Sequence, residues 1–269
     1  MKVRQALAAA ATRLAPSTDT PRLDAELLLA HALGVTREAL LLVDMDADAP
    51  LAFDALVARR AAGEPVAYII GIRAFWTIEL KVGPGVLIPR PDSETLIEAA
   101  VAHFGAAGPA SILDLGTGPG TLLLAALAQW PDARGLGVDA SEQALDYARD
   151  NAATLGLADR AHFRTGDWAE GIDGPFDLIL CNPPYVERGA DLPRDVAEWS
   201  PTAPCSLQRT GSARCAGSRR TCRACSLLKA SPASRSEWAR PRPPRPCSTP
   251  RASLSPPTAI LPATSAAWR

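Results

Sequence analysis

The sequence predicts an α/β protein in which a Rossmann-like domain with a parallel sheet follows a small helical domain. Three observations support this fold class. Apolar residues recur at helical spacing over the first 70 residues. From residue 111 onward, short β-forming segments alternate with helical ones, a pattern that gives a parallel sheet with helices on both faces. A glycine-rich turn follows the first of these strands, at the sheet edge where such folds bind ligands.

The first 91 residues divide into a helical domain, residues 1–70, and a β-hairpin linker, residues 71–91. Helical spacing of Leu27 and its neighbours predicts a helix that stops at Gly34, and a second helix covers residues 51–62. From Tyr68 to Val82 the residues are mostly β-formers interrupted by glycine, which predicts strand structure.

The α/β domain is expected to span residues 92–199, with a tail at 200–269. Asp92 or Ser93 is predicted to cap its first helix. The predicted helices are 95–104, 121–129 and 141–155, and the predicted strands are 112–115, 135–138, 162–163 and 176–180. Ser141 is expected to cap the third helix.

Charge divides the chain at about residue 199. Residues 1–199 carry 16 Lys and Arg against 28 Asp and Glu, a net charge of -12, whereas residues 200–269 carry 12 against one, a net charge of +11. No stretch approaches the roughly 20 apolar residues that span a membrane, so we expect a cytoplasmic protein without membrane association. We also expect a monomer.

The tail has 11 Pro, 12 Ser and 11 Arg but no Val, Phe or Tyr, too little apolar surface to offset the entropy of ordering. Three interpretations compete: a natural disordered basic tail, a metal site around Cys222 and Cys225, or an out-of-frame translation of GC-rich DNA. The metal site is the weakest, because the tail has no second CxxC pair and no histidine. The frameshift leads, because it explains the abrupt change in composition.

The turn from Asp114 to Gly120 reads DLGTGPG. Its glycines let a ligand approach the backbone. Dinucleotide sites space their glycines G-x-G-x-x-G; the spacing here is G-x-G-x-G, which favours S-adenosylmethionine. The cofactor-binding candidates in this turn are Gly116, Thr117, Gly118, Pro119 and Gly120.

Three further residues at strand ends are cofactor candidates. Asp139 can accept the ribose hydroxyls, although a carboxylate there could instead cap a helix. Asp167 and Trp168 can hold and stack an adenine ring, although an isolated tryptophan is more often part of a core.

The most specific motif is NPPY, Asn182 to Tyr185, after the fourth strand. The Asn182 side-chain carbonyl and the Pro183 main-chain carbonyl can accept both N–H groups of a planar nitrogen, which orients the group and raises its electron density. Pro184 stiffens the turn, and Tyr185 offers a face for stacking. We assign catalysis to Asn182, Pro183 and Tyr185, substrate binding to all four residues, and a further cofactor contact to Asn182. No metal is required.

Together these motifs resemble the HemK/PrmC family of protein-glutamine methyltransferases, which modify the Gly-Gly-Gln loop of peptide chain release factors in translation termination. The resemblance covers residues 15–199 and rests on RLDAELLLAHALG, PVAYIIGIRAFW, VLIPRPDSETLIE, DLGTGPG and NPPYV. It implies a class I S-adenosylmethionine-dependent methyltransferase domain whose sheet lacks its last strands, and cofactor contacts at Gly116 to Gly120, Asp139, Trp168 and Asn182. It also implies that residues 1–70 dock a class 1 release factor. Pro119 departs from the small or polar residue usual in the family.

Two alternatives remain open. An amino methyltransferase of adenine or guanine would share NPPY, but the acidic body disfavours binding to phosphates. The chain could also be an inactive truncated product. Because an incomplete sheet exposes an edge and apolar helix faces, we expect poor solubility and weak activity.

Overall fold

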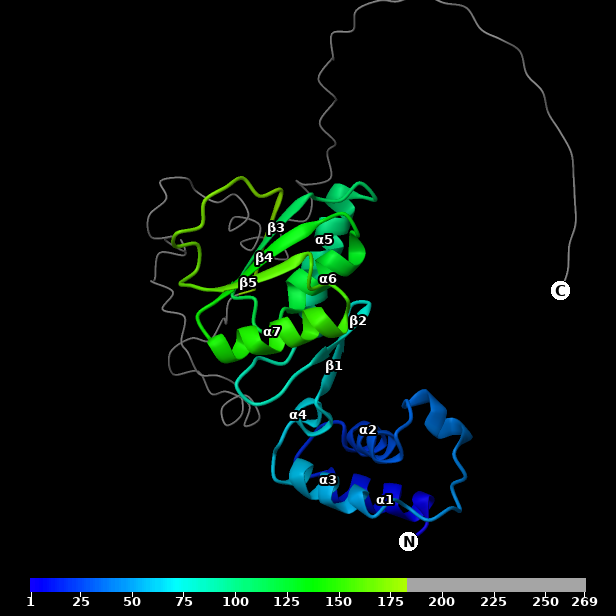
Figure 1. Ribbon diagram of the computed structural model, residues 1–269. Helices are drawn as coiled ribbons and strands as arrows, with labels where there is room; N and C mark the ends of the chain where they lie inside the picture. Colours follow the sequence, from blue (N-terminus) through cyan, green and yellow to red (C-terminus); the bar gives the residue numbers. More distant parts are fainter. Residues whose placement is uncertain (183–269) are drawn as a thin grey trace, which may run out of the picture. The chain divides into compact units, whose positions relative to one another are not determined.

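A computed structural model describes residues 1–182 of the chain (Figure 1). The helices are α1 (Val3–Leu14), α2 (Pro21–Leu33), η1 (Glu38–Leu42), α3 (Ala52–Ala61), α4 (Val66–Ile70), η2 (Pro91–Ser93), α5 (Glu94–Phe104), α6 (Thr121–Gln129) and α7 (Glu142–Thr154). The strands are β1 (Ile72–Phe75), β2 (Ile78–Lys81), β3 (Ser111–Leu115), β4 (Arg134–Asp139), β5 (Ala161–Thr165) and β6 (Leu178–Cys181). Pro183, Pro184, Tyr185 and the predicted tail lie outside the described residues.

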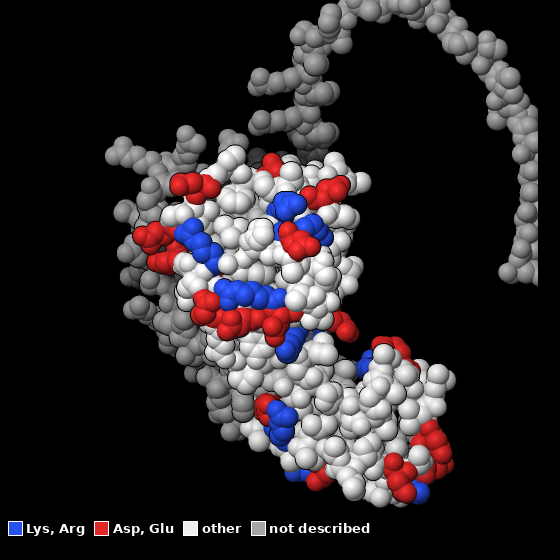
Figure 2. Space-filling model, viewed as in Figure 1, with Lys and Arg blue, Asp and Glu red and all other residues white. Residues whose placement is uncertain are grey.

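Acidic and basic side chains are interspersed on the face of the molecule shown in Figure 2. Several charged side chains of the described residues pair across neighbouring elements, as Lys81 of β2 does with Asp150 of α7 at 2.9 Å. Both partners of that pair are well exposed, and such pairs contribute little to stability. No broad basic area covers this face of residues 1–182, although basic residues are present on it.

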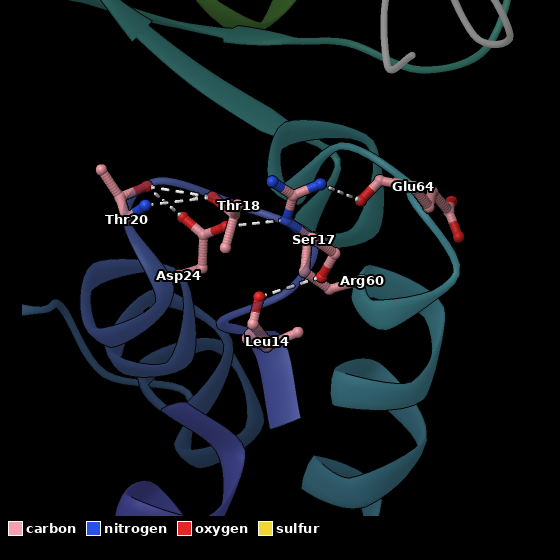
Figure 3. Close-up of polar contacts among 7 residues, drawn as sticks. All are labelled: Leu14, Ser17, Thr18, Thr20, Asp24, Arg60 and Glu64. Atoms are coloured by element: carbon pink, nitrogen blue, oxygen red, sulfur yellow. Dashed lines mark hydrogen bonds and ion pairs between the residues drawn. The ribbon is translucent and has the colours of Figure 1, made fainter. Parts of the chain in front are cut away.

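Helices α1, α2 and α3 share one apolar core, and a buried ion pair joins two of them. Leu14, Leu28 and Val57 of this core are almost fully buried. At the start of α2, Asp24 accepts a hydrogen bond from the Thr20 hydroxyl at 3.0 Å and from the Arg60 guanidinium of α3 at 2.7 Å (Figure 3). The Asp24 and Arg60 side chains are only 8% and 12% exposed. The pair therefore ties α2 to α3 out of contact with most of the solvent.

Residues 66–70 form helix α4, and the strand structure predicted from Tyr68 onward begins only at Ile72. Ala67 and Tyr68 belong to the core of the α/β domain, whereas Ile69 belongs to the core of the helical domain. A helical turn supplies side chains to two cores within five residues, and this packing overrides the β preference of isoleucine and tyrosine. Gly71 ends the helix at φ 79°, in the left-handed region open to glycine.

The predicted hairpin is present as the antiparallel pair β1–β2, with Phe75 opposite Ile78. Trp76 occupies the turn at φ 54°, an unusual conformation for an aromatic residue. Two hydrogen bonds hold it there. Its main-chain N–H donates to the Glu94 carboxylate at 2.9 Å and its indole donates to the Gln129 side chain at 3.3 Å.

The four remaining strands form a parallel sheet in the order β5-β4-β3-β6. Figure 1 shows α6 and α7 packed along these strands. On one face, Ile112 and Leu180 join residues of α5, α6 and α7 in a single core. On the other face, Leu113 and Leu115 meet side chains of the loop 166–177. Within residues 1–182, therefore, helices cover one face only, and the expectation of helices on both faces is not met in this part of the chain.

Two predicted helix caps have different outcomes. The Ser141 hydroxyl accepts from the Ala144 N–H at 3.2 Å, so the predicted cap of α7 is confirmed. Ser93 stands at the N-cap position of α5, just before Glu94, but neither it nor Asp92 makes a side-chain cap hydrogen bond, so that prediction is wrong. The Ser93 hydroxyl has another partner, Asn182.

Candidate active site

The glycine turn between β3 and α6 leaves open space above its backbone. The N–H groups of Gly116 and Thr117 donate to the Val138 carbonyl at 2.8 and 3.0 Å, which anchors the turn to β4. Gly116 and Gly118 have φ angles of 70° and 55°, and a Cβ atom at either position would meet nothing within 4 Å. The turn thus requires glycine for its conformation and offers room for a ligand.

Asp114 lies under this turn with one oxygen unpaired. Its Oδ2 accepts from the Thr117 hydroxyl at 2.6 Å and the Leu123 N–H at 3.2 Å. Its Oδ1 is buried and has no hydrogen-bond partner among the described residues. Burial raises the pKa of Asp114 to about 7, partly opposed by these two hydrogen bonds and reinforced by the charge of Asp139. A cationic group of a ligand would satisfy the unpaired oxygen and favour the ionised carboxylate.

Asp139 ends β4 and braces the glycine turn. One of its oxygens accepts from the Gly118 N–H at 2.8 Å and the other from the Ser141 N–H at 2.9 Å. Each carboxylate oxygen can accept a second hydrogen bond. The predicted ribose role therefore remains available to Asp139, which also positions the turn and the start of α7.

A pocket brings together the glycine turn, the segment before η2 and the end of β6. It is lined by Leu87, Ile88, Pro89, Arg90, Ser93, Asp114, Gly116, Thr117, Gly118, Pro119, Thr121, Leu122 and Asn182. Of the predicted site residues, Gly116 to Pro119 and Asn182 line it. Gly120 is not part of the lining; it begins α6 at φ 85°.

Asp167 and Trp168 are not among the residues that line this pocket. Trp168 has φ 51° and packs beside Leu113, Leu115 and Val138 on the loop-covered face of the sheet. Asp167 is exposed. Both follow the carboxyl end of β5, as the sequence suggested, and their contact with adenine remains a prediction.

Several residues of this region were not identified from the sequence as part of the site. Ser93 and Arg90 lie in the segment LIPRPDSE, which indicated the family and a helix cap but no role in the site. Asn151 is 2% exposed and donates its side-chain amide to the Pro119 carbonyl at 2.9 Å. A polar residue in the apolar stripe of a helix was the signal that could have pointed to Asn151.

The part of the chain that the structure describes contains no cluster of three His, Cys, Asp or Glu side chains suited to a metal ion. Among the helices of residues 1–182, none combines the length and the apolar character needed to cross a bilayer.

Comparison with known proteins gives the class and then the family. A model of the "Methyltransferase small domain" matches residues 92–230, more than half of the chain. The parallel sheet, the glycine turn and the acidic end of β4 agree with it, and together they define a class I methyltransferase domain. A model of the "PrmC N-terminal domain" matches residues 5–71. The chain belongs to the HemK/PrmC family.

Curated relatives support this membership and carry the name "Release factor glutamine methyltransferase". The protein of Rhodospirillum rubrum is 47% identical over 189 residues, which are 68% of this chain and 58% of that protein. The protein of Mycolicibacterium smegmatis is 46% identical over 72% of this chain and 69% of its own length. The protein of Cereibacter sphaeroides is 42% identical over 75% of this chain and 73% of its own length. This chain spans about three fifths of the length of several such relatives.

Proposed function

We propose that this protein transfers a methyl group from S-adenosylmethionine to the glutamine side chain in the Gly-Gly-Gln loop of class 1 peptide chain release factors. The observation that carries the proposal is the position of Asn182, which follows β6 directly and lines the same pocket as the glycine turn. The names of the curated relatives support the substrate.

The residues of the pocket fit S-adenosylmethionine. The open backbone at Gly116 and Gly118 gives room for its methionine moiety, and the buried, unpaired Oδ1 of Asp114 suits an ammonium group. The remaining acceptor capacity of Asp139 suits ribose hydroxyls. When bound, the cofactor supplies an electrophilic methyl group on a sulfonium centre.

Asn182 would orient the substrate. A glutamine amide nitrogen is a weak nucleophile because its lone pair is delocalised into the carbonyl. The Asn182 Oδ1 accepts one amide N–H, and the Pro183 carbonyl, outside the described residues, is expected to accept the other. Two fixed acceptors hold the nitrogen in one orientation, so its placement supplies most of the catalysis.

Exposed leucines in the helical domain support a docking role for residues 1–70. Leu41 and Leu42 of η1 are 87% and 89% exposed, and Leu51 before α3 is 99% exposed. Apolar side chains that stand free on a small domain favour contact with a protein partner. The interspersed charges in Figure 2 and the net charge of -12 over residues 1–199 offer less to a nucleic acid.

The test is a methyl-transfer assay with radiolabelled S-adenosylmethionine and three acceptors: a purified release factor, DNA and ribosomal RNA. We expect label in the release factor alone, located by mass spectrometry on the glutamine of its Gly-Gly-Gln loop. The matched control is a release factor with that glutamine changed to glutamate, which should take up no label. Label in a nucleic acid, or in the control, would overturn the proposal.

A further inference from the structure

Ser93 occupies a capping position but does not cap its helix. It stands at the N-cap position of α5, where a serine hydroxyl usually accepts a hydrogen bond from the backbone N–H two or three residues on. No such bond is present. The hydroxyl instead accepts a hydrogen bond from the Asn182 Nδ2 at 2.7 Å, between residues 89 positions apart in the chain. The Ser93 hydroxyl therefore contacts a residue of the site and does not cap α5.

Both ends of this contact are held in place. Ser93 is 8% exposed, and its main-chain N–H donates to the Arg90 carbonyl at 3.0 Å, which closes the turn of η2. Pro89 and Pro91 restrict the backbone on either side of Arg90. Asn182 directly follows β6, which pairs with β3 along its length.

The contact engages one end of the Asn182 amide. A side-chain amide has one acceptor end and one donor end, and rotation by 180° exchanges them. Donation from Nδ2 to Ser93 engages the donor end and leaves Oδ1 as the end available to a ligand. In the opposite rotamer the Ser93 hydroxyl could donate to Oδ1, but Nδ2 would then face an incoming amide N–H, and two donors would meet.

We propose that Ser93 is a positioning residue that anchors the Asn182 side chain in the rotamer described here, in which Oδ1 is presented to the N–H of the substrate amide. This rests on the proposed function for its substrate, but the orientation itself is a property of the free protein. In this role Ser93 acts through Asn182, although it also lines the pocket.

The kinetic test compares Ser93→Ala, Ser93→Cys and Ser93→Thr with the unaltered chain in release-factor methylation. Alanine removes the hydrogen-bond acceptor and cysteine weakens it. We expect kcat to fall about 10-fold, because one hydrogen bond changes the population of the productive Asn182 rotamer by about that factor. Threonine keeps the hydroxyl and should restore kcat to within about twofold. Because Ser93 also lines the pocket, kcat is measured at saturating S-adenosylmethionine, where a change in cofactor affinity does not lower it. Equal kcat in the serine and alanine proteins would overturn the inference.

A matched control is Thr95→Ala. Thr95 lies in the first turn of the same helix, is exposed, and donates its hydroxyl only to the Asp92 carbonyl at 2.7 Å among the described contacts. Its loss should leave kcat unchanged. If it lowers kcat as much as Ser93→Ala does, the effect belongs to the helix start and the inference fails.

A second measurement stands apart from the proposed function. In ¹⁵N-labelled protein, the side-chain NH₂ signal of Asn182 is identified by its absence in Asn182→Ser. We expect its hydrogen exchange to be at least several-fold faster in Ser93→Ala and Ser93→Cys than in the unaltered chain and Ser93→Thr. If the unaltered chain transfers no methyl group but the variants show this exchange pattern, the proposed function fails while the role of Ser93 in holding Asn182 stands. If exchange is equal in all four proteins, the role of Ser93 fails, whatever the methylation activity.

Discussion

The side-chain amide of Asn151, in α7, donates to the main-chain carbonyl of Pro119, in the glycine turn, at 2.9 Å. The same amide group also donates to the Lys81 carbonyl at 3.1 Å, and its oxygen accepts from the Lys81 N–H at 2.7 Å. One buried side chain thus joins α7 and the hairpin strand β2 to the turn. Because Pro119 has no N–H that could anchor the turn, the hydrogen bond to its carbonyl is the contact by which Asn151 holds this part of the turn.

Replacement of Asn151 by leucine should destabilise the protein and weaken cofactor binding together. Three backbone groups lose their partner, two of Lys81 and one of Pro119, and each buried unpaired group costs about 1–3 kcal/mol. We expect a loss of about 3 kcal/mol in the free energy of unfolding by urea, and weaker binding of S-adenosylhomocysteine by calorimetry. The neighbouring Asp150→Asn removes only an exposed ion pair and should cost below about 1 kcal/mol. Equal costs for the two variants would show that Asn151 has no special role.

Gly118→Ala should separate ligand binding from stability. At φ 55° an added Cβ is strained by about 1 kcal/mol, and it projects into the open space where the ligand is expected. Gly34→Ala is the matched control, since Gly34 ends α2 at φ 67° and its Cβ would also meet nothing within 4 Å. Both variants should lose similar stability in urea, but only Gly118→Ala should weaken S-adenosylhomocysteine binding, by 10-fold or more (about 1.4 kcal/mol). Unchanged binding in Gly118→Ala would remove the turn from the cofactor site.

The sequence predicted well those parts of the fold in which local pattern and tertiary packing agree. The helix over residues 121–129 has the predicted bounds. Its apolar run is limited by the glycine turn that precedes it and by the short connection to β4 that follows it. The prediction failed at α4, a five-residue segment rich in β-forming residues whose side chains pack into two different cores. Local propensity cannot reveal such packing.

The candidate site shows the same division. The glycine turn and Asn182 were predicted because each carries its chemistry in a short motif. The contact between Ser93 and Asn182 spans 89 positions, and the contact between Asn151 and Pro119 spans 32. Such contacts arise only when the sheet brings the segments together, so a single sequence gave no means of finding them.

The stability of the protein should fall with rising pH through Asp114. Its pKa is raised from 3.8 to about 7 on folding, so the folded chain holds the proton more tightly than the unfolded chain. The contribution is complete below about pH 4 and is lost as the pH rises through about 7. It amounts to roughly 4 kcal/mol at most. Asp114→Asn should remove this slope, measured as the difference between the two proteins in urea unfolding from pH 4 to pH 8. Parallel curves would show that Asp114 does not titrate in this range.

Ligand binding should act on the same proton. If the Asp114 Oδ1 receives the ammonium group of the cofactor, binding favours the ionised carboxylate and releases a proton near or below pH 7. Calorimetry of S-adenosylhomocysteine binding at pH 6.5, in buffers of different ionisation enthalpy, measures the protons released. We expect a clear fraction of a proton from the unaltered chain and almost none from Asp114→Asn. Equal release from both would place the ammonium group elsewhere.

The buried ion pair between Asp24 and Arg60 should matter to the helical domain through the cost of leaving one partner alone. Arg60→Met leaves the Asp24 carboxylate buried with the Thr20 hydroxyl as its remaining side-chain partner among the described residues, and we expect a loss of about 3–5 kcal/mol in the free energy of unfolding. Asp24→Asn combined with Arg60→Met removes both charges and should recover much of this loss, because the desolvation of an unpaired charge disappears. The exposed pair of Arg13 with Asp54 provides the comparison: Arg13→Met should cost less than about 1 kcal/mol. A double variant no more stable than Arg60→Met alone would show that packing of the arginine side chain, and not its charge, holds α2 to α3.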